Sequence, residues 1–440
     1  MIFPAAGGIF RRHAGRMLRL SAPLTTAAAE SRQDGKAGRN MGIKTAYKGY
    51  KAYDYLTPGV DYPHFKLARW DWAGRYVLPL DGAQEERALR LARECVYIAL
   101  HEHPTLTPDN IEELVALDRA GRESCDYEAL SFSYLDCVFD NMMDGTCHIV
   151  SHSGWKFEDI LVDFGNRMCD LHHQDFLFQC KGVSDILRAH REGRVAWVPV
   201  LEGAAPIENE LDRIDVLYGL GIRMMGITYS ESNALGSGLK EDFDGGLTKF
   251  GRQAVRRMNL LGMLIDCSHA GPKTTLDTVE YSDKPLILSH IGARALWDSK
   301  RLCGDDVLKA VAQKGGVLGV EAAPHTTMTK TRNTHDLDSY MEHFEYIANL
   351  VGIDHVSFGT DGLYGDHVGL HHLFSKSLAT GDTKNRQADY EEVPYVKGLE
   401  NPTEASVNIL RWLVKHGYDD NDIRKVLGEN ALRVLREVWI

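Results

Sequence analysis

The sequence lacks an uninterrupted run of 18 apolar residues, a C-x-x-C pair and a basic stripe. Without such an apolar run we expect no transmembrane helix. The eight cysteines are scattered, so neither a disulfide framework nor zinc-finger spacing is present, and we expect reduced thiols in a reducing compartment. A formal net charge of −12 argues against a nucleic-acid partner, because a phosphate backbone requires a basic protein face.

Acidic residues are missing from the start of the chain, where the first acid is Glu30. The first 40 residues are rich in Arg, Ala and Ser, which is typical of a transit peptide, and they lack the compact apolar segment of a secretory signal. An equal alternative is translation from Met41, preceded by an artefact or a disordered tail. We exclude residues 1–40 from the fold and treat residues 41–440 as one domain. We predict a cytoplasmic protein, or a mitochondrial one if the leader is genuine.

Short apolar runs alternate with amphipathic stretches from about residue 95 onward. Eight runs are candidate strands: 95–100, 146–151, 196–201, 222–228, 262–267, 285–289, 315–319 and 355–359. Several intervening helical patterns end in glycine, as a helix C-cap does. This alternation predicts βαβ units, and eight of them predict an α/β fold of the (β/α)₈ TIM-barrel type. A doubly wound sheet is disfavoured because no Gly-rich phosphate loop follows the first strand.

Two connections in this pattern are unusually long. Residues 104–145 follow the first strand and include two short helical patterns, so we expect an insertion there. Residues 363–400 are polar and irregular, and a loop of that length usually forms a lid, a binding element or an interface. The chain then ends in two predicted closing helices within residues 401–438.

Side chains that can bind a metal follow five of the eight predicted strands. They are His101, His103, Glu202, His269, His290 and Asp361. The carboxyl ends of barrel strands form the active-site face, so we expect these side chains to meet. Four imidazoles and two carboxylates suit zinc, and six ligands have room for two ions bridged by a carboxylate. A single strand-end histidine is more often structural, but chance agreement at five strand ends is far less expected.

Six other histidines are weaker candidates: His148, His152, His172, His173, His371 and His372. The first two form an H-x-x-x-H pair that could be an alternative pair of ligands. We favour a role in facing the substrate or in supporting the ligands over direct binding of a metal. The next two lie in a helical pattern and are expected to pack or to face solvent. The last two can reach the site only if the loop at 363–400 folds over it.

Several motifs resemble the membrane (renal-type) dipeptidases, the M19 branch of the amidohydrolase superfamily. They include VLEG, LTKFGRQAVRRMNLLGMLIDCSHAG, PLILSHIGARAL and IDHVSFGTDG, and in order they cover about two thirds of residues 95–440. The resemblance implies a binuclear zinc hydrolase of dipeptides in which Glu202 bridges the metals. It also implies ligand roles for His269, His290 and Asp361, a substrate-carboxylate contact for Arg301, and a homodimer.

Two positions depart from the family pattern. The family's first motif is H-x-D, whereas residues 101–103 read HEH, so the neutral His103 replaces an anionic ligand and leaves the metals more positive. After the fourth strand the family carries T-H-N, whereas residues 228–230 read TYS. Tyr229 can still donate a hydrogen bond to an oxyanion, although without a cationic ring. The hydrolytic chemistry is therefore expected to persist while the substrate need not be an ordinary dipeptide.

The predicted reaction is attack by a water held between two zinc ions on the amide carbonyl of a small, carboxylate-bearing, dipeptide-like substrate. Asp361 would ligate one ion and pass the proton to the leaving group. Tyr229, helped by His152, would face the oxyanion, and Arg301 would hold the carboxylate. The alternative is a non-peptide substrate, handled by lactone or ester hydrolysis, deamination or decarboxylation. A non-enzymatic binding module is a third hypothesis.

Overall fold

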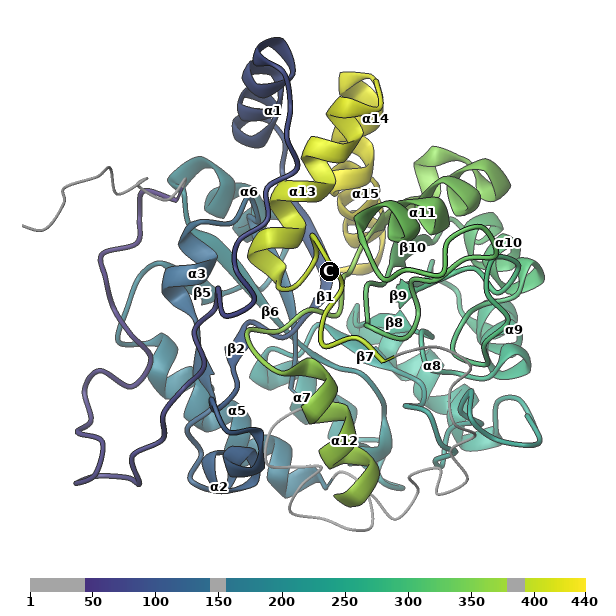
Figure 1. Cartoon of the computed structure of the whole chain (residues 1–440). Coiled ribbons are helices and arrows are strands. Elements are labelled where there is room, and N and C mark those ends of the chain that lie inside the picture. The colour runs from purple at the N-terminus through teal and green to yellow at the C-terminus, as the bar shows by residue number, and fades with distance from the viewer. Residues whose placement is uncertain (1–43, 143–155, 378–391) are drawn as a thin grey trace, which may run out of the picture. The chain divides into compact units, whose positions relative to one another are not determined.

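Eight parallel strands form one curled sheet in the computed structural model, which describes residues 44–142, 156–377 and 392–440 (Figure 1). In sheet order they are β1 (Ile98–Glu102), β4 (Cys137–Asn141), β6 (Val195–Leu201), β7 (Met224–Gly226), β8 (Leu264–Asp266), β9 (Ile287–Ile291), β10 (Val317–Val320) and β11 (Val356–Phe358). A short extra strand, β5 (Leu177–Gln179), pairs with the first residues of β6. Chain order and sheet order agree, as successive right-handed βα units require.

The first and last strands of this order meet through backbone hydrogen bonds. The N–H of Asp361 donates to the carbonyl of His101 at 3.2 Å, and the N–H of His103 donates to the carbonyl of Gly362 at 2.8 Å. Such alternating bonds are those of parallel neighbours, so the sheet closes on itself. The predicted α/β barrel is confirmed.

Helices surround this sheet, and in Figure 1 α8 to α11 follow one another around the outside of β7 to β10. The helices are α1 (Gly82–Glu94), α2 (Leu114–Arg119), α3 (Tyr127–Ser131), α5 (Phe157–Leu171), α6 (Val183–Glu192), α7 (Arg213–Leu220), α8 (Lys249–Leu261), α9 (Pro272–Tyr281), α10 (Asp305–Gln313), α11 (Leu337–Val351), α12 (His367–Ser377), α13 (Pro402–Lys415), α14 (Asp420–Arg424) and α15 (Asn430–Val438). The glycine endings predicted from the sequence are found, for example at Gly262, whose φ of 75° terminates α8 in the left-handed region. None of the helices among the described residues is both long enough and apolar enough to span a membrane.

The C-terminal helices close the end of the barrel opposite the predicted ligands. One buried cluster joins the first residues of the strands, such as Ile98 and Cys137, to residues of α15, such as Leu432 and Leu435. The prediction of closing helices is confirmed, with α14 and α15 joined by the π-helical turn η4 (Lys425–Glu429). Since α15 covers the starts of the strands, their carboxyl ends are left for the site.

The second barrel strand is Cys137–Asn141, so the prediction of this strand at residues 146–151 is wrong. Residues 146–151 lie outside the described residues. The strand ends in two polar residues, Asp140 and Asn141, which in the sequence look like the start of a loop. Both side chains are nevertheless buried, and Asp140 accepts a hydrogen bond from Arg167 at 2.7 Å. A partner from a neighbouring helix, which no local pattern reveals, therefore makes this polar strand end stable.

Arg167 should be a major contributor to stability. Its guanidinium donates to Asp140 and, at 2.5 Å, to Glu123, and all three side chains are buried. We expect Arg167→Ala to lower the free energy of unfolding by about 3–5 kcal/mol, because it removes the cationic partner of two buried carboxylates. Urea unfolding measures this loss. The control is Lys66→Ala, which removes a solvent-exposed pair with Asp109 and should change stability by less than about 1 kcal/mol. Equal losses in the two variants would contradict the expectation.

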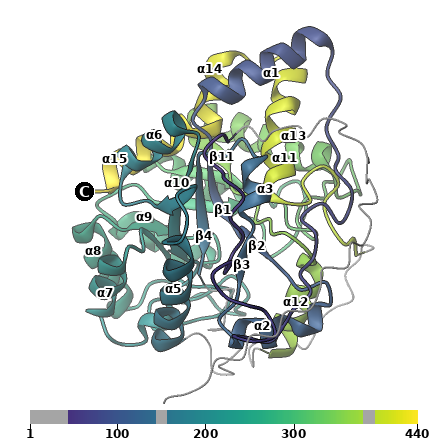
Figure 2. The same ribbon diagram turned by 90° about the vertical axis from the view of Figure 1, so that its left-hand side faces the viewer.

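The two long connections contain more regular structure than predicted. The insertion after β1 holds the hairpin of β2 (Thr105–Leu106) and β3 (Ser124–Cys125), the turn η1 (Ile111–Glu113), and the helices α2 and α3. The stretch 363–400, predicted to be irregular, contains α12. Leucines of α12 share a buried cluster with leucines of α2, and the two helices lie close together in Figure 2. The insertion therefore supports α12.

Candidate active site

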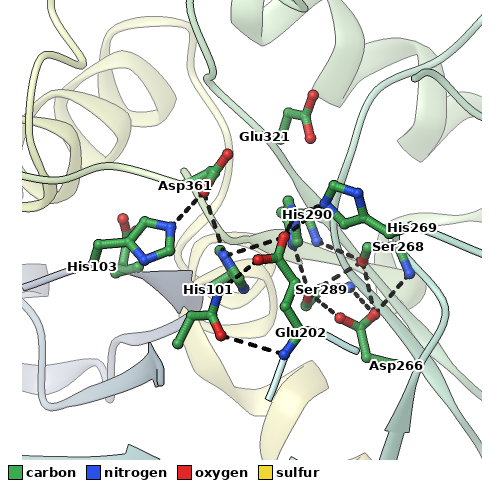
Figure 3. Close-up of polar contacts among 12 residues, drawn as sticks. His101, His103, Glu202, Asp266, Ser268, His269, Ser289, His290, Glu321 and Asp361 are labelled. Carbon is green, nitrogen blue, oxygen red and sulfur yellow. Dashed lines mark hydrogen bonds and ion pairs between the residues drawn. The ribbon is translucent and has the colours of Figure 1, made fainter. Parts of the chain in front are cut away.

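The six predicted ligands converge where their strands end, and Figure 3 shows them around a common centre. On one side of this centre, Glu202 Oε1 lies 2.7 Å from Nε2 of His269 and 3.0 Å from Nε2 of His290. The two imidazole Nε2 atoms are themselves 3.0 Å apart. Glu202 follows β6, His269 follows β8 and His290 lies within β9, so three separate strands aim these atoms at one point.

On the other side, Asp361 Oδ1 lies 2.8 Å from Nε2 of His103 and 3.3 Å from Nε2 of His101. His101 joins the two halves, because its Nε2 is also 3.9 Å from Glu202 Oε1 and its ring stacks on that of His290 with centroids 3.8 Å apart. Burial alone would raise the pKa of Asp361, but the neighbouring imidazoles of His101 and His103 hold it well below its usual range. Asp361 is therefore a carboxylate.

Glu102, the middle residue of the HEH motif, holds Asp361 in place. Asp361 has φ of 57°, the left-handed region that non-glycine residues avoid. The buried carboxylate of Glu102 accepts the backbone N–H groups on either side, from Thr360 at 3.1 Å and from Gly362 at 2.9 Å. Burial raises the pKa of Glu102 to about 7, although these hydrogen bonds oppose the rise. Sequence reasoning gave this residue no role.

Hydrogen bonds among buried side chains determine which ring nitrogen of His290 carries the proton. Asp266 accepts the hydroxyl protons of Ser289 at 2.6 Å and of Ser268 at 2.7 Å. Since Ser289 gives its only proton to this carboxylate, its oxygen accepts from Nδ1 of His290 at 2.8 Å. Burial also lowers the pKa of His290 well below its usual value, which keeps the ring neutral. His290 Nε2 is then left as a bare lone pair directed at the centre.

This arrangement fits a bound cation. The lone pair of His290 Nε2 lies 3.0 Å from the carboxylate oxygen of Glu202, and two lone pairs repel unless a positive charge lies between them. The side chains of His101, Glu202 and His290 form one group whose ligand atoms lie within 4.8 Å of one another, and His101, His103 and Asp361 form another. Buried imidazole and carboxylate donors of this kind suit zinc and related divalent ions.

Arg301 lies beside the centre, but its guanidinium already has protein partners. It donates to the backbone carbonyls of Ser268 at 3.2 Å and His290 at 3.1 Å, and it forms an ion pair with the buried carboxylate of Glu321. Burial raises the pKa of Glu321 to about 7, while Arg301 opposes that rise. Glu321 directly follows β10 and lies at the margin of the cluster (Figure 3). The strand-end rule that located the ligands also applies to this missed residue.

The other predicted site residues are placed as follows. Tyr229 stacks on His269 with ring centroids 4.4 Å apart, so it borders the site, and its role toward an oxyanion stays a prediction. His152 and His148 lie outside the described residues. His172 and His173 are exposed, as expected.

The loop histidines separate into one that reaches the site and one that does not. His371 shares a group of ligand atoms within 4.8 Å with Asp361 and His367, a residue not singled out from the sequence. The ring of His371 is also 5.3 Å from that of His325. His372 is exposed and lies 2.8 Å from Glu392. Burial, aided by neighbouring positive groups, lowers the pKa of both His325 and His371 to about 3.

A closed barrel with imidazole and carboxylate side chains gathered at its strand ends is typical of hydrolases of the amidohydrolase type. The chain belongs to the membrane dipeptidase family, peptidase family M19, whose family model matches residues 146–374 and 387–439. Membership implies binding of a divalent metal. The match begins after β1 and β4, so the HEH motif stands outside it.

Three similar proteins support this placement. An uncharacterized protein in the pqqA 5′ region of Klebsiella pneumoniae is 30% identical over 276 residues, which cover 61% of this chain and 91% of that protein. Dipeptidase tcpJ of Claviceps purpurea is 25% identical over 292 residues, which cover 66% of this chain and 61% of that protein. The crystal structure of an amidohydrolase from Pseudomonas aeruginosa superimposes with a TM-score of 0.65 at 26% identity, covering 80% of this chain and 99% of that one.

Proposed function

We propose that this hydrolase cleaves the amide bond of a small, dipeptide-like substrate that carries a carboxylate, using two zinc ions. The observation that carries the proposal is the placement of two carboxylates among four imidazoles. Glu202 lies between His269 and His290, and Asp361 accepts from His103. The Claviceps relative bears the name dipeptidase, which supports the same bond type. A homodimer and a cytoplasmic location remain predictions from the sequence.

Metal binding, proton transfer and stabilisation of the oxyanion would fall to different residues of the site. Divalent ions, when bound in a pair, supply an activated water and polarise the carbonyl. One ion would be held by Glu202, His269 and His290, and the other by His101, His103 and Asp361. Asp361 would carry a proton from the water to the leaving nitrogen. Tyr229, stacked beside His269, would donate its hydroxyl proton to the oxygen on which charge develops.

Arg301 would bind the substrate carboxylate in competition with Glu321. We expect Glu321→Gln to lower KM for a carboxylate-bearing substrate about tenfold, or ~1.4 kcal/mol, because it removes a buried negative charge from the same guanidinium. Because the pKa of Glu321 is raised to about 7, the wild-type KM should fall as the pH drops through 7 and Glu321 is protonated. In the variant this pH dependence should vanish.

Initial-rate kinetics between pH 6 and 8 measure this effect. The control is Glu342→Gln in α11. The Glu342 carboxylate lies 2.7 Å from Arg332, and its replacement should leave KM unchanged. A higher KM for Glu321→Gln would instead mean that Glu321 binds a positive group of the substrate or positions Arg301.

The proposed function is tested by metal content together with turnover. We would purify the full chain without added metal, measure zinc by mass spectrometry, and assay panels of dipeptides and of lactones and esters. Zinc with dipeptide cleavage, both lost on chelation and restored by zinc, is the expected result. Zinc with lactone or ester turnover alone would favour the second candidate function, a non-peptide hydrolase. Two observations favour this candidate. Arg301 is already paired with Glu321, and a tyrosine, Tyr229, stands where the family pattern has a histidine.

A further inference from the structure

A second group of metal-binding side chains adjoins the centre at α12. One ligand atom each of Asp361, His367 and His371 lie within 4.8 Å of one another. Only Asp361 is shared with the two zinc positions proposed above, and α12 contributes no ligand to either of them. We propose that Asp361, His367 and His371 form a third cation site, which takes a divalent ion such as zinc. The inference rests on the proposed function, because it places this ion beside the pair.

The spacing of the two histidines suits this role. His367 and His371 are four residues apart on α12, so their side chains lie on one face of the helix, and their ring centroids are 4.5 Å apart. Two histidines at this spacing on a helix are a recurrent zinc-binding pair. With one carboxylate they complete a set of two imidazoles and one carboxylate, which catalytic zinc sites use while keeping a position open.

The helix that carries the pair is fixed at its first turn. The side chain of Asp366 accepts the N–H of Gly369 at 2.8 Å, which caps the helix, and the N–H of Asp366 donates to Thr107 Oγ1 at 3.2 Å. Leu370 and Leu373 of the same helix belong to the buried cluster shared with α2. The histidines are therefore presented from a supported element, as a ligand site requires.

Asp361 is placed so that its carboxylate can bind two ions at once. Its Oδ1 faces His103, and a carboxylate has a second oxygen with which it can bridge neighbouring cations. The ring of His103 lies 6.4 Å from that of His367, so the α12 group directly continues the one at β1. An ion held there would add to the positive field of the pair, and with three protein ligands it would have capacity left for an anionic oxygen of the substrate.

The test counts ions in the full chain. Apoprotein is titrated with zinc alone, and bound zinc per chain is measured by mass spectrometry after gel filtration. We expect three ions in the wild type and two when His367→Gln and His371→Gln are combined. Glutamine retains a polar side chain, so circular dichroism should show an unchanged fold.

The matched control is His372→Gln, which should keep three ions. His372 neighbours the pair on the same helix but pairs with the exposed Glu392, and it lines a surface pocket of about 390 Å³ that includes neither His367 nor His371. An unchanged count in the double variant, or a wild-type count of two with turnover intact, overturns the third site alone. A wild-type count of zero overturns the proposed function with it.

Discussion

Replacing Glu202 with glutamine should remove most bound zinc and lower kcat about 10³-fold or more, equivalent to ~4 kcal/mol of transition-state stabilisation. Among the described residues, Glu202 has the only carboxylate that lies within 4 Å of Nε2 of both His269 and His290. The amide keeps the shape of the side chain and loses the charge that offsets the cations. Without it, like charges in a buried centre are no longer compensated.

Zinc content and kcat, measured on the same preparation, decide this prediction. The control is Glu208→Gln, which removes a half-exposed partner of Arg213 from the segment that follows β6 and should leave both quantities unchanged. Asn141 donates to Glu202 Oε2 at 2.5 Å, and an amide at 202 can rotate to accept that bond, so the fold should survive. Wild-type zinc content with wild-type turnover in Glu202→Gln would refute the proposed ligand role.

The sequence predicted the barrel and the six converging side chains because both follow local rules. Apolar runs bounded by polar residues mark strands, and the polar residue after each run lies on the carboxyl face. His269 and His290 were found by this rule without any knowledge of what lies across the barrel. The rule depends on assigning each strand correctly, and it applied equally to Glu321, whose pairing with Arg301 became visible only in the structure.

The parts that were missed depend on partners distant in the chain. Asp140 makes a strand look like a loop, and it is stable when buried because Arg167 bonds to it from α5. Glu102 separates the two histidines of the first motif, and its role rests on backbone N–H groups 258 and 260 residues away. The α12 histidines looked like loop residues because the apolar face of that helix is short and packs on an insertion.

Replacing Asp361 with asparagine should lower kcat by about 10²–10⁴-fold, the range expected for loss of a general acid–base group. Its carboxylate accepts from His103 at 2.8 Å and lies 3.3 Å from His101, and the left-handed backbone fixes its direction. An amide can still lie in this position, but it cannot take the proton from the attacking water. The loss should therefore be largest for substrates whose leaving group needs a proton.

A comparison of leaving groups separates this role from simple ligation. An amide substrate needs its nitrogen protonated as it departs, whereas a nitrophenyl ester does not, so Asp361→Asn should lower kcat for the amide far more than for the ester. The control is Asp354→Asn, whose exposed carboxylate pairs with Lys425 at the opposite end of β11. Equal losses for both substrates would leave Asp361 as a ligand only, and the proton would have to travel through another group. Asp361 is also a proposed ligand of the third ion, so the same variant should lose that ion as well. Both metal assignments therefore depend on this one carboxylate.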